Sequence, residues 1–322
     1  MSYQPDNSIS RRDFLKVTGL ALGSLAVGNS IPRTIERLRL IKKYGPATRV
    51  PALEFHGDNY YFYDGAYCMN PPTFKYLMTL LQENEVWAAT SDEVVAYIQG
   101  HLELPARSII LTTDSGNVSH TSLERMTPVL QETGMHFISL IWTRFMQANE
   151  SVLCQGDICW DGFRQAKDSG VFSFGSHSET HRDLALLSPE EGLIDMLDSK
   201  KEIEDMLGIT PQLISWPFES VPSWAPILAD HGFVGSFAGG GSRKTMLENV
   251  ILPNEPSPWD LPRLLPPNIG SLTSGRPGGK TMQEMLEMFT DGFGENFTAH
   301  QKQVQLENNA RNLYFRKMHP LR

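Results

Sequence analysis

The chain has 322 residues, of which 40% are hydrophobic and 20% are charged, and its formal net charge is −9. This is ordinary globular composition, at a length that suits one large domain or two small ones. The acidic balance argues against nucleic acid or an anionic membrane as a main partner, because both attract clustered lysine and arginine. The three cysteines are too few, and odd in number, for a dense disulfide framework.

The N-terminal segment has the layout of an export signal. Arg11 and Arg12, with Phe-Leu-Lys at positions 14–16, precede an apolar run over residues 17–27. This order is typical of a secretory signal, and the paired arginines resemble the twin-arginine signal. We therefore assign residues 1–28 to such a signal and expect a periplasmic, extracellular or membrane-anchored protein outside the cytoplasm. The run is too short to span a hydrocarbon core of ~30 Å comfortably. If it is not cleaved, the segment would remain as a membrane anchor.

The rest of the chain reads as one α/β domain. Residues 29–50 are basic, begin as a helix and form a linker; residues 51–290 form the domain; and residues 291–322 are a polar C-terminal tail. Strands are predicted at 52–55, 108–113, 136–141, 171–174 and 213–216, and helices at 72–83, 91–98, 123–133, 161–169, 189–207 and 222–231. This alternation predicts a parallel sheet or barrel with active-site loops at the carboxyl ends of the strands.

Three of the loops that follow predicted strands carry reactive or aromatic side chains. In the first loop, over residues 112–116, Asp114 is placed to act as a base or a ligand, or to bond backbone amides in an Asx turn. In the second, His177 and His181 are four residues apart, which puts both imidazoles on one face of a helical turn, within reach of one metal ion. Either a metal site or a chance pairing explains the two histidines when they are taken alone.

The third loop contains the sequence Trp216-Pro217-Phe218. The two aromatic rings either wall a groove of the size of a sugar or pack a turn against the core. Leu261-Pro262-Arg263 adds an arginine near the end of the domain.

Taken in this order, the three loops resemble the polysaccharide deacetylase family, carbohydrate esterase family four, over roughly residues 50–290. Residues 112–116 are similar to the family's Thr-Phe-Asp-Asp-Gly motif, and His177 to His181 match its His-Ser/Thr-x-x-His motif. Trp216 to Phe218 are similar to its aromatic-Pro-aromatic turn. Leu53 to Gly57 are similar to the first strand of the subgroup that acts on poly-N-acetylglucosamine-type polymers.

The resemblance implies a distorted (β/α) barrel of seven or eight strands and removal of N-acetyl groups from an N-acetylated polysaccharide. It implies that His177 and His181 hold a divalent metal, commonly zinc, and that Asp114 is the general base. Arg263 is the candidate for the arginine that orients this base. The general acid has no clear counterpart, and His56 and His120 are the stand-ins.

One departure bears on the metal site. The family's second aspartate, a metal ligand, is replaced by Ser115, whose neutral hydroxyl is a poorer ligand than a carboxylate. Three outcomes remain open: water fills the gap, Asp114 turns to bind the metal, or the site is catalytically silent. Two alternative functions therefore stand beside deacetylation: an inactive domain that binds glycan, and a hydrolase of another non-peptide C–N bond. The oligomeric state is not predicted.

Overall fold

The computed structural model describes residues 31–56, 71–115, 120–144, 160–239 and 249–264. The predicted signal over 1–28 and the tail over 291–322 lie outside these residues, as do the three cysteines. Nothing in the fold therefore bears on the predicted export signal.

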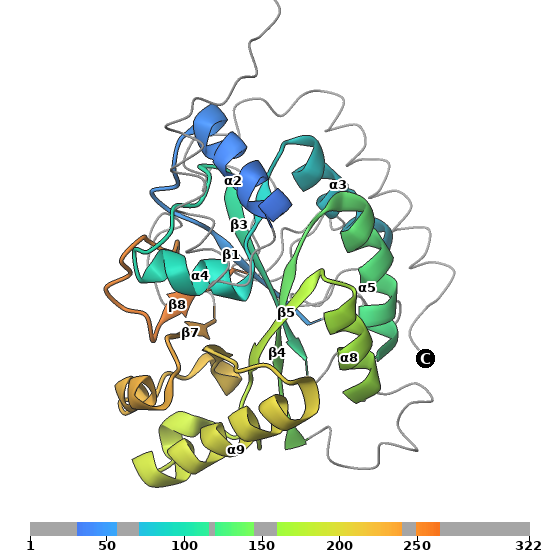
Figure 1. Ribbon diagram of the computed structural model, residues 1–322. Coiled ribbons are helices and arrows are strands. Elements are labelled where there is room, and N and C mark those ends of the chain that lie inside the picture. Colours follow the sequence, from blue (N-terminus) through green and yellow to red (C-terminus); the bar gives the residue numbers. More distant parts are fainter. Residues whose placement is uncertain (1–30, 57–70, 116–119, 145–159, 240–248, 265–322) are drawn as a thin grey trace, which may run out of the picture.

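The strands form a parallel sheet that nearly closes into a barrel (Figure 1). They are β1 (Ala52–Phe55), β2 (Trp87–Ala88), β3 (Ser108–Ser115), β4 (Phe137–Ile141), β5 (Phe172–Ser176), β6 (Leu213–Ser215), β7 (Gly235–Ala238) and β8 (Leu261–Pro262). Seven strands follow the order β1-β3-β4-β5-β6-β7-β8, and β2 pairs with β3 off this path. A parallel bridge between Leu53 and Leu264 joins the two ends of the path. This is the distorted barrel that the sequence predicts.

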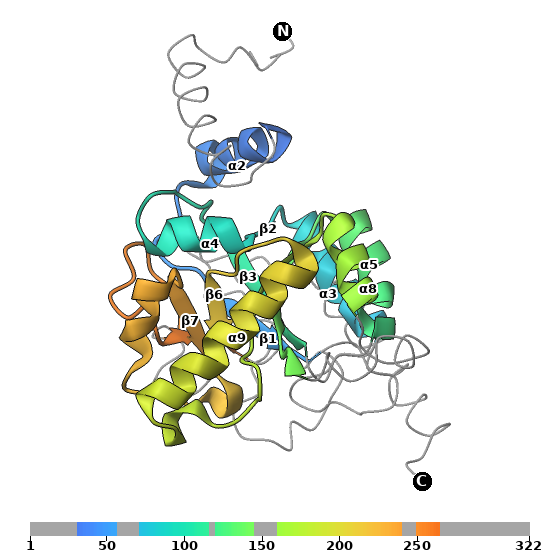
Figure 2. The ribbon, with the colours of Figure 1, turned by 60° about the horizontal axis from the view of Figure 1, so that its bottom comes forward.

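Helices cover the outside of the sheet. They are α2 (Ile31–Tyr44), α3 (Pro71–Glu83), α4 (Ser91–Ile98), α5 (His120–Thr133), α8 (Trp160–Asp168) and α9 (Pro189–Leu207), with the short 3₁₀ helices η1 (Leu184–Leu186), η2 (Pro217–Glu219) and η3 (Ala225–His231). The helices α3, α5 and α8 lie side by side, and α2 lies outside the barrel next to α4 (Figures 1 and 2). Among the described residues, no helix combines the length and apolarity needed to cross a membrane.

Local sequence explains most of the boundaries. The helix α9 starts as predicted, because Ser188 and Glu191 form a capping box, and it ends at Gly208, whose φ of 65° suits a left-handed C-cap. The N-cap of α4 is Thr90, whose side chain accepts from the backbone amide of Glu93. The helix predicted at 222–231 is a 3₁₀ helix that starts at Ala225. The strand β3 continues to Ser115, two residues beyond its predicted end.

The interior of the barrel changes character along its length. Ala52, Ile110, Ile138 and Phe237 belong to one buried apolar cluster. Because side chains alternate along a strand, Glu54 lies on the same face of β1 as Ala52. The barrel interior is therefore packed with apolar side chains toward the amino ends of the strands and carries polar ones toward their carboxyl ends.

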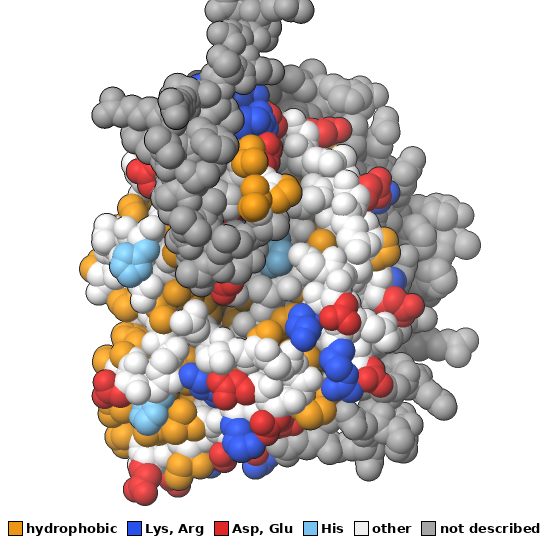
Figure 3. Space-filling model, viewed as in Figure 1, with side chains coloured by type: hydrophobic (Ala, Val, Ile, Leu, Met, Phe, Trp, Pro, Cys, Tyr) orange, Lys and Arg blue, Asp and Glu red, His pale blue; other side chains and the backbone are white. Residues whose placement is uncertain are grey.

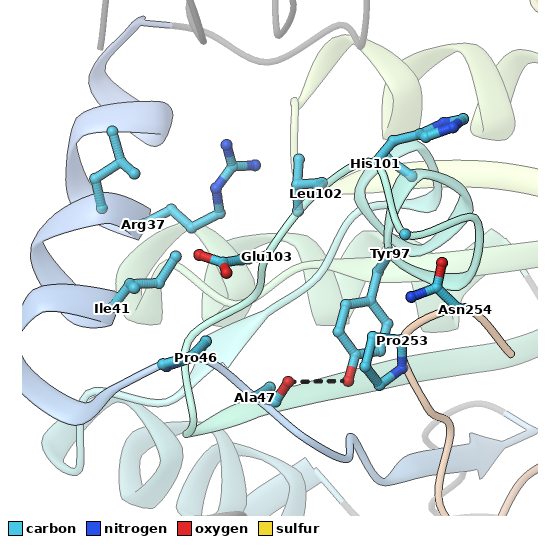
Figure 4. Close-up of a pocket in the computed structure, with 13 residues that line it drawn as sticks. Arg37, Ile41, Pro46, Ala47, Tyr97, His101, Leu102, Glu103, Pro253 and Asn254 are labelled. Carbon is cyan, nitrogen blue, oxygen red and sulfur yellow. Dashed lines mark hydrogen bonds between the residues drawn. The ribbon is translucent and has the colours of Figure 1, made fainter. Parts of the chain in front are cut away.

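A cavity of about 590 Å³ lies at the opposite end, where residues that precede β1, β3 and β8 meet α2 (Figure 4). Arg37 of α2 lines it, is 3% exposed, and bonds Glu93 of α4 at 3.5 Å. Arg33 bonds the same carboxylate at 2.7 Å, so two arginines attach α2 to the barrel. The outer side of α2 exposes hydrophobic side chains, among them Ile31 and Ile35 (Figure 3).

Candidate active site

Polar side chains from several strands meet at the carboxyl end of the barrel. They surround a cavity of about 330 Å³. The lining residues are Glu54, His56, Asp114, His177, His181, Trp216, Phe218 and Glu219. The predicted residues Asp114, His177 and His181 therefore do meet in one place, although they come from different strands.

The centre of the site is an ion pair between Asp114 and Arg263. Nη1 of Arg263 donates to Oδ1 of Asp114 at 2.6 Å, and Nη2 donates to Oδ2 at 2.9 Å. The two side chains are buried, at 4% and 0% exposure. Burial on its own would raise the pKa of Asp114, but the charge of Arg263 outweighs it and holds the pKa below its usual range. Asp114 is therefore ionised at neutral pH, in the orientation that Arg263 fixes.

Glu54 is a second carboxylate beside this pair. It lies in β1, opposite Thr112 of β3, and its Oε1 accepts from Nη2 of Arg263 at 3.1 Å. Burial raises the pKa of Glu54 to about 8, and the negative charge of Asp114 adds to this effect against the opposing charge of Arg263. Sequence reasoning takes residues 52–55 as a short apolar strand and misses Glu54. The signal is a single acidic residue in an apolar run, at an inward-facing position.

The imidazole of His177 is fixed by Ser215 of β6. Its Nδ1 lies 3.0 Å from the carbonyl oxygen of Ser215 and 2.7 Å from the hydroxyl, and that hydroxyl donates to Asp114 at 3.1 Å. Nδ1 must then carry the hydrogen, which leaves the lone pair on Nε2, 3.9 Å from Oδ2 of Asp114. Burial lowers the pKa of His177 to about 4. His177 is therefore neutral at neutral pH and presents a free nitrogen toward Asp114.

The loop from His177 to His181 is not the helical turn that the spacing predicts. Ser178 and His181 have φ angles of 70° and 55°, so the chain turns through left-handed conformations after β5. The two imidazole rings still approach each other, with centroids 4.8 Å apart. The prediction of a helical turn was wrong, and the prediction that the two rings lie together was right.

Helix α9 holds this loop in place. The buried carboxylate of Asp195 accepts from the backbone amides of Glu179 at 2.8 Å and Thr180 at 3.2 Å. Ser199, one turn further along, bonds the hydroxyl of Ser176 at 2.7 Å. These contacts compensate for a loop without regular backbone pairing.

Aromatic rings surround the second histidine. The ring of His181 lies between Trp142 and Phe218, with centroid distances of 4.6 and 5.1 Å. His181 is half-buried, and burial lowers its pKa. This ring therefore has a fixed orientation at the mouth of the cavity.

The three residues of the aromatic turn differ in their surroundings. Trp216 is 1% exposed, lines the cavity with part of its ring, and donates through Nε1 to Ser236 at 2.8 Å. Pro217 is buried and is not among the lining residues. Phe218 is 66% exposed and has a φ of 58°. Of the three, Phe218 presents an open aromatic surface.

Other sequence candidates lie elsewhere or outside the described side chains. Two acidic residues that follow His177, Glu179 and Asp183, do not line the cavity: Glu179 pairs with Arg144 at 3.2 Å, and Asp183 caps η1. His56 lines the cavity, whereas the side chain of His120 is not described. The backbone of Ser115 ends β3 opposite Ile141. Its side chain lies outside the described part of the structure.

The donor set fits a divalent metal. Glu54, His56 and Asp114 each place one ligand atom within 4.8 Å of those of the other two. Two further imidazoles, His177 and His181, line the same cavity. Carboxylate oxygens and neutral imidazole nitrogens are the ligands that zinc and related ions take.

Comparisons with known proteins agree with this fold. Residues 101–234 match the sequence model of the polysaccharide deacetylase family. The deacetylase PplD of Streptococcus pyogenes, solved in complex with acetate, has 17% identity and a TM-score of 0.56, covering 68% of this chain and 92% of that one. IcaB from Ammonifex degensii has 18% identity and the same TM-score, covering 69% and 93%. None of the curated proteins matches the chain in sequence.

The fold and the site define the class as a (β/α)-barrel protein with a metal-type donor cluster at the carboxyl ends of its strands. The match over residues 101–234 agrees with the resemblance to the polysaccharide deacetylase family, whose members hydrolyse C–N bonds and generally use a divalent metal.

Proposed function

We propose that the chain is a metal-dependent hydrolase that removes N-acetyl groups from an extracellular or cell-envelope polysaccharide. The observation that carries the proposal is the buried, ionised Asp114, held by Arg263 at 2.6 and 2.9 Å beside the free nitrogen of His177. A carboxylate so oriented is placed to accept a proton in an open cavity.

His177 and His181 would hold the metal, which we expect to be zinc. When bound, such an ion polarises a carbonyl group and lowers the pKa of a water molecule. The Nδ1 hydrogen of His177 is engaged by Ser215, so Nε2 is the atom left for the metal. The lowered pKa of His177 keeps that nitrogen free of a proton.

Asp114 takes a proton from the water that attacks the acetamide carbonyl. Arg263 stays charged throughout and keeps both oxygens of Asp114 in position. The C–N bond then breaks, and the amine leaves with a proton. Burial lowers the pKa of His56, so this neutral imidazole, which lines the cavity, is the candidate to relay to the amine the proton that Asp114 took from the water. The products are acetate and a free amine on the sugar.

Phe218 and Trp216 are the proposed contacts for the sugar. The exposed ring of Phe218 packs edge-on against His181, with centroids 5.1 Å apart, so it borders the entrance beside the reacting group. An apolar ring face stacks on the apolar face of a pyranose. The match of residues 101–234 to the polysaccharide deacetylase model supports a polysaccharide substrate.

The N-terminal assignments are part of the same proposal. Residues 1–28 would direct export by the twin-arginine route, residues 29–50 would lead into the catalytic domain at 51–290, and residues 291–322 would form a polar tail. An extracellular polymer as substrate is consistent with an exported enzyme.

Ser115 favours a second candidate, an inactive domain of the same fold that binds glycan. Acetate release from N-acetylglucosamine oligomers by purified protein, with added zinc and after chelation, separates the two. The enzyme hypothesis predicts release that stops on chelation and returns with zinc. Oligomer binding with no release under either condition would support the binding domain.

A further inference from the structure

Glu54 has an oxygen atom with no partner at the centre of the site. Its Oε1 bonds Arg263 at 3.1 Å, but its Oε2 is buried and has no hydrogen-bond partner among the described residues. Glu54 is 2% exposed. A buried carboxyl oxygen without a partner is unfavourable whether or not the group holds a proton, so it points to a ligand that the site accommodates, and a bound cation would displace the proton.

The register of the sheet directs this oxygen toward the other donors. Glu54 and His56 are two residues apart on β1 and its end, so they share one face. Glu54 pairs with Thr112, which puts Asp114 of β3 on the same face two residues further on. The ligand atoms of Glu54, His56 and Asp114 consequently lie within 4.8 Å of one another.

The charges around the site identify what is missing. The two oxygens of Asp114 are bound by Arg263, and the histidines that line the cavity offer no negative charge. Position 115, where the family's motif supplies a carboxylate, holds a serine. A divalent ion in this cavity therefore needs an anionic ligand from elsewhere.

We propose that Glu54 is a ligand of the metal, supplying from β1 the carboxylate that position 115 lacks. This inference rests on the metal-dependent function proposed above. Glu54 would hold the ion together with imidazoles that line the same cavity, and Asp114 would keep its role as the base.

Glu219 is the other carboxylate that lines the cavity, and its position differs. Its side chain fills the space over Gly239, just after β7: a Cβ added there would lie 1.6 Å from Cδ of Glu219. Glu219 is exposed, whereas Glu54 is 2% exposed and has a buried oxygen without a hydrogen-bond partner among the described residues. Glu219 therefore serves as the matched comparison within the same cavity.

The test is zinc affinity of the full chain, measured by competition with a chromophoric chelator. Glu54→Gln should raise the Kd by more than the roughly 10- to 100-fold that loss of an outer-shell partner costs, and Ser115→Asp in the same background should restore it. Glu219→Gln should leave the Kd unchanged. So should Glu255→Gln, which alters a buried glutamate that accepts backbone amides outside the cavity. An unchanged Kd in Glu54→Gln, or a loss confined to Glu219→Gln, overturns the proposal.

Two further measurements keep the outcomes apart. If wild-type protein binds zinc and His177→Ala abolishes binding while Glu54→Gln does not, Glu54 is not a ligand and the metal-dependent function stands. If wild-type protein binds no zinc, both fail. If Glu54→Gln does not fold, Glu54→Asp is loaded with cobalt instead, and its visible absorption spectrum is compared with that of the cobalt-loaded wild type. A spectrum identical to that of the wild type would count against Glu54.

Discussion

Arg263 and Asp114 are 149 positions apart in the sequence, yet the guanidinium binds both oxygens of the carboxylate at 2.6 and 2.9 Å. The pair connects the two ends of the strand path, because Arg263 directly follows β8 and Asp114 lies in β3. It also orients the carboxylate that we propose as the base. An ion pair with this burial stabilises the fold only while both partners are present.

Arg263→Gln should therefore lower the free energy of unfolding by about 3–5 kcal/mol, because it leaves Asp114 buried without its counter-charge. Adding Asp114→Asn to Arg263→Gln should recover part of the stability but no acetate release. Urea unfolding followed by tryptophan fluorescence measures the first quantity. Equal midpoints for wild type and Arg263→Gln would show that the pair does not support the fold.

Asp195 should matter for activity although it does not line the cavity. Asp195→Ala removes the acceptor for two backbone amides of the histidine loop, which costs about 2 kcal/mol or more. Hydrogen exchange at Glu179 and Thr180 should become faster, and acetate release should fall. Asp198→Ala, on the exposed side of the same helix, is the control and should change stability by less than about 0.5 kcal/mol. Similar hydrogen-exchange rates at Glu179 and Thr180 in the two variants would show that Asp195 does not hold the histidine loop.

Replacing Phe218 with glycine should stabilise the fold and weaken the use of substrate. Its φ of 58° is unfavourable for a side chain with a Cβ, so Phe218→Gly should raise the free energy of unfolding by about 1 kcal/mol. The same change removes the exposed ring and should raise KM for oligomers with little effect on kcat. Phe218→Ala keeps the backbone strain and loses the ring, so it should share the KM effect alone. Steady-state kinetics with an unchanged KM would remove Phe218 from the substrate site.

His136 should make the fold sensitive to acid. Burial lowers its pKa to about 3, and its Nε2 lies 3.1 Å from the hydroxyl of Ser173. Because the folded pKa is below the unfolded value of about 6.5, this stability is present at neutral pH and is lost as the pH falls below 6.5. Between pH 7 and pH 4 the wild type should lose about 3 kcal/mol more than His136→Gln. Parallel curves of stability against pH would contradict the buried neutral state.

The alternating strands and helices could be predicted from sequence because their apolar periodicity and caps are local. Ser188 and Glu191 at one end of α9, and the glycine at position 208 at the other, are local signals that define its bounds. The meeting of Asp114 with His177 also followed, because loops after parallel strands gather at one edge of a sheet.

Glu54 and the shape of the histidine loop depend on distant contacts and could not be predicted in this way. The left-handed turn at Ser178 and His181 is held by Asp195 of α9, which no local pattern indicates. The inward position of Glu54 depends on the register of β1 against β3, and a strand of four residues is too short to reveal it. In both cases a tertiary contact overrides the local expectation.

The position of a bound zinc ion is the most informative measurement for this site. Anomalous diffraction at the zinc edge, from crystals of the full chain grown with zinc, would locate it without reference to activity. We expect a peak within about 2.0–2.2 Å of Nε2 of His177, a ring nitrogen of His181 and an oxygen of Glu54. No peak in the cavity beside Asp114, or a peak with neither histidine as a ligand, would contradict the proposed metal site.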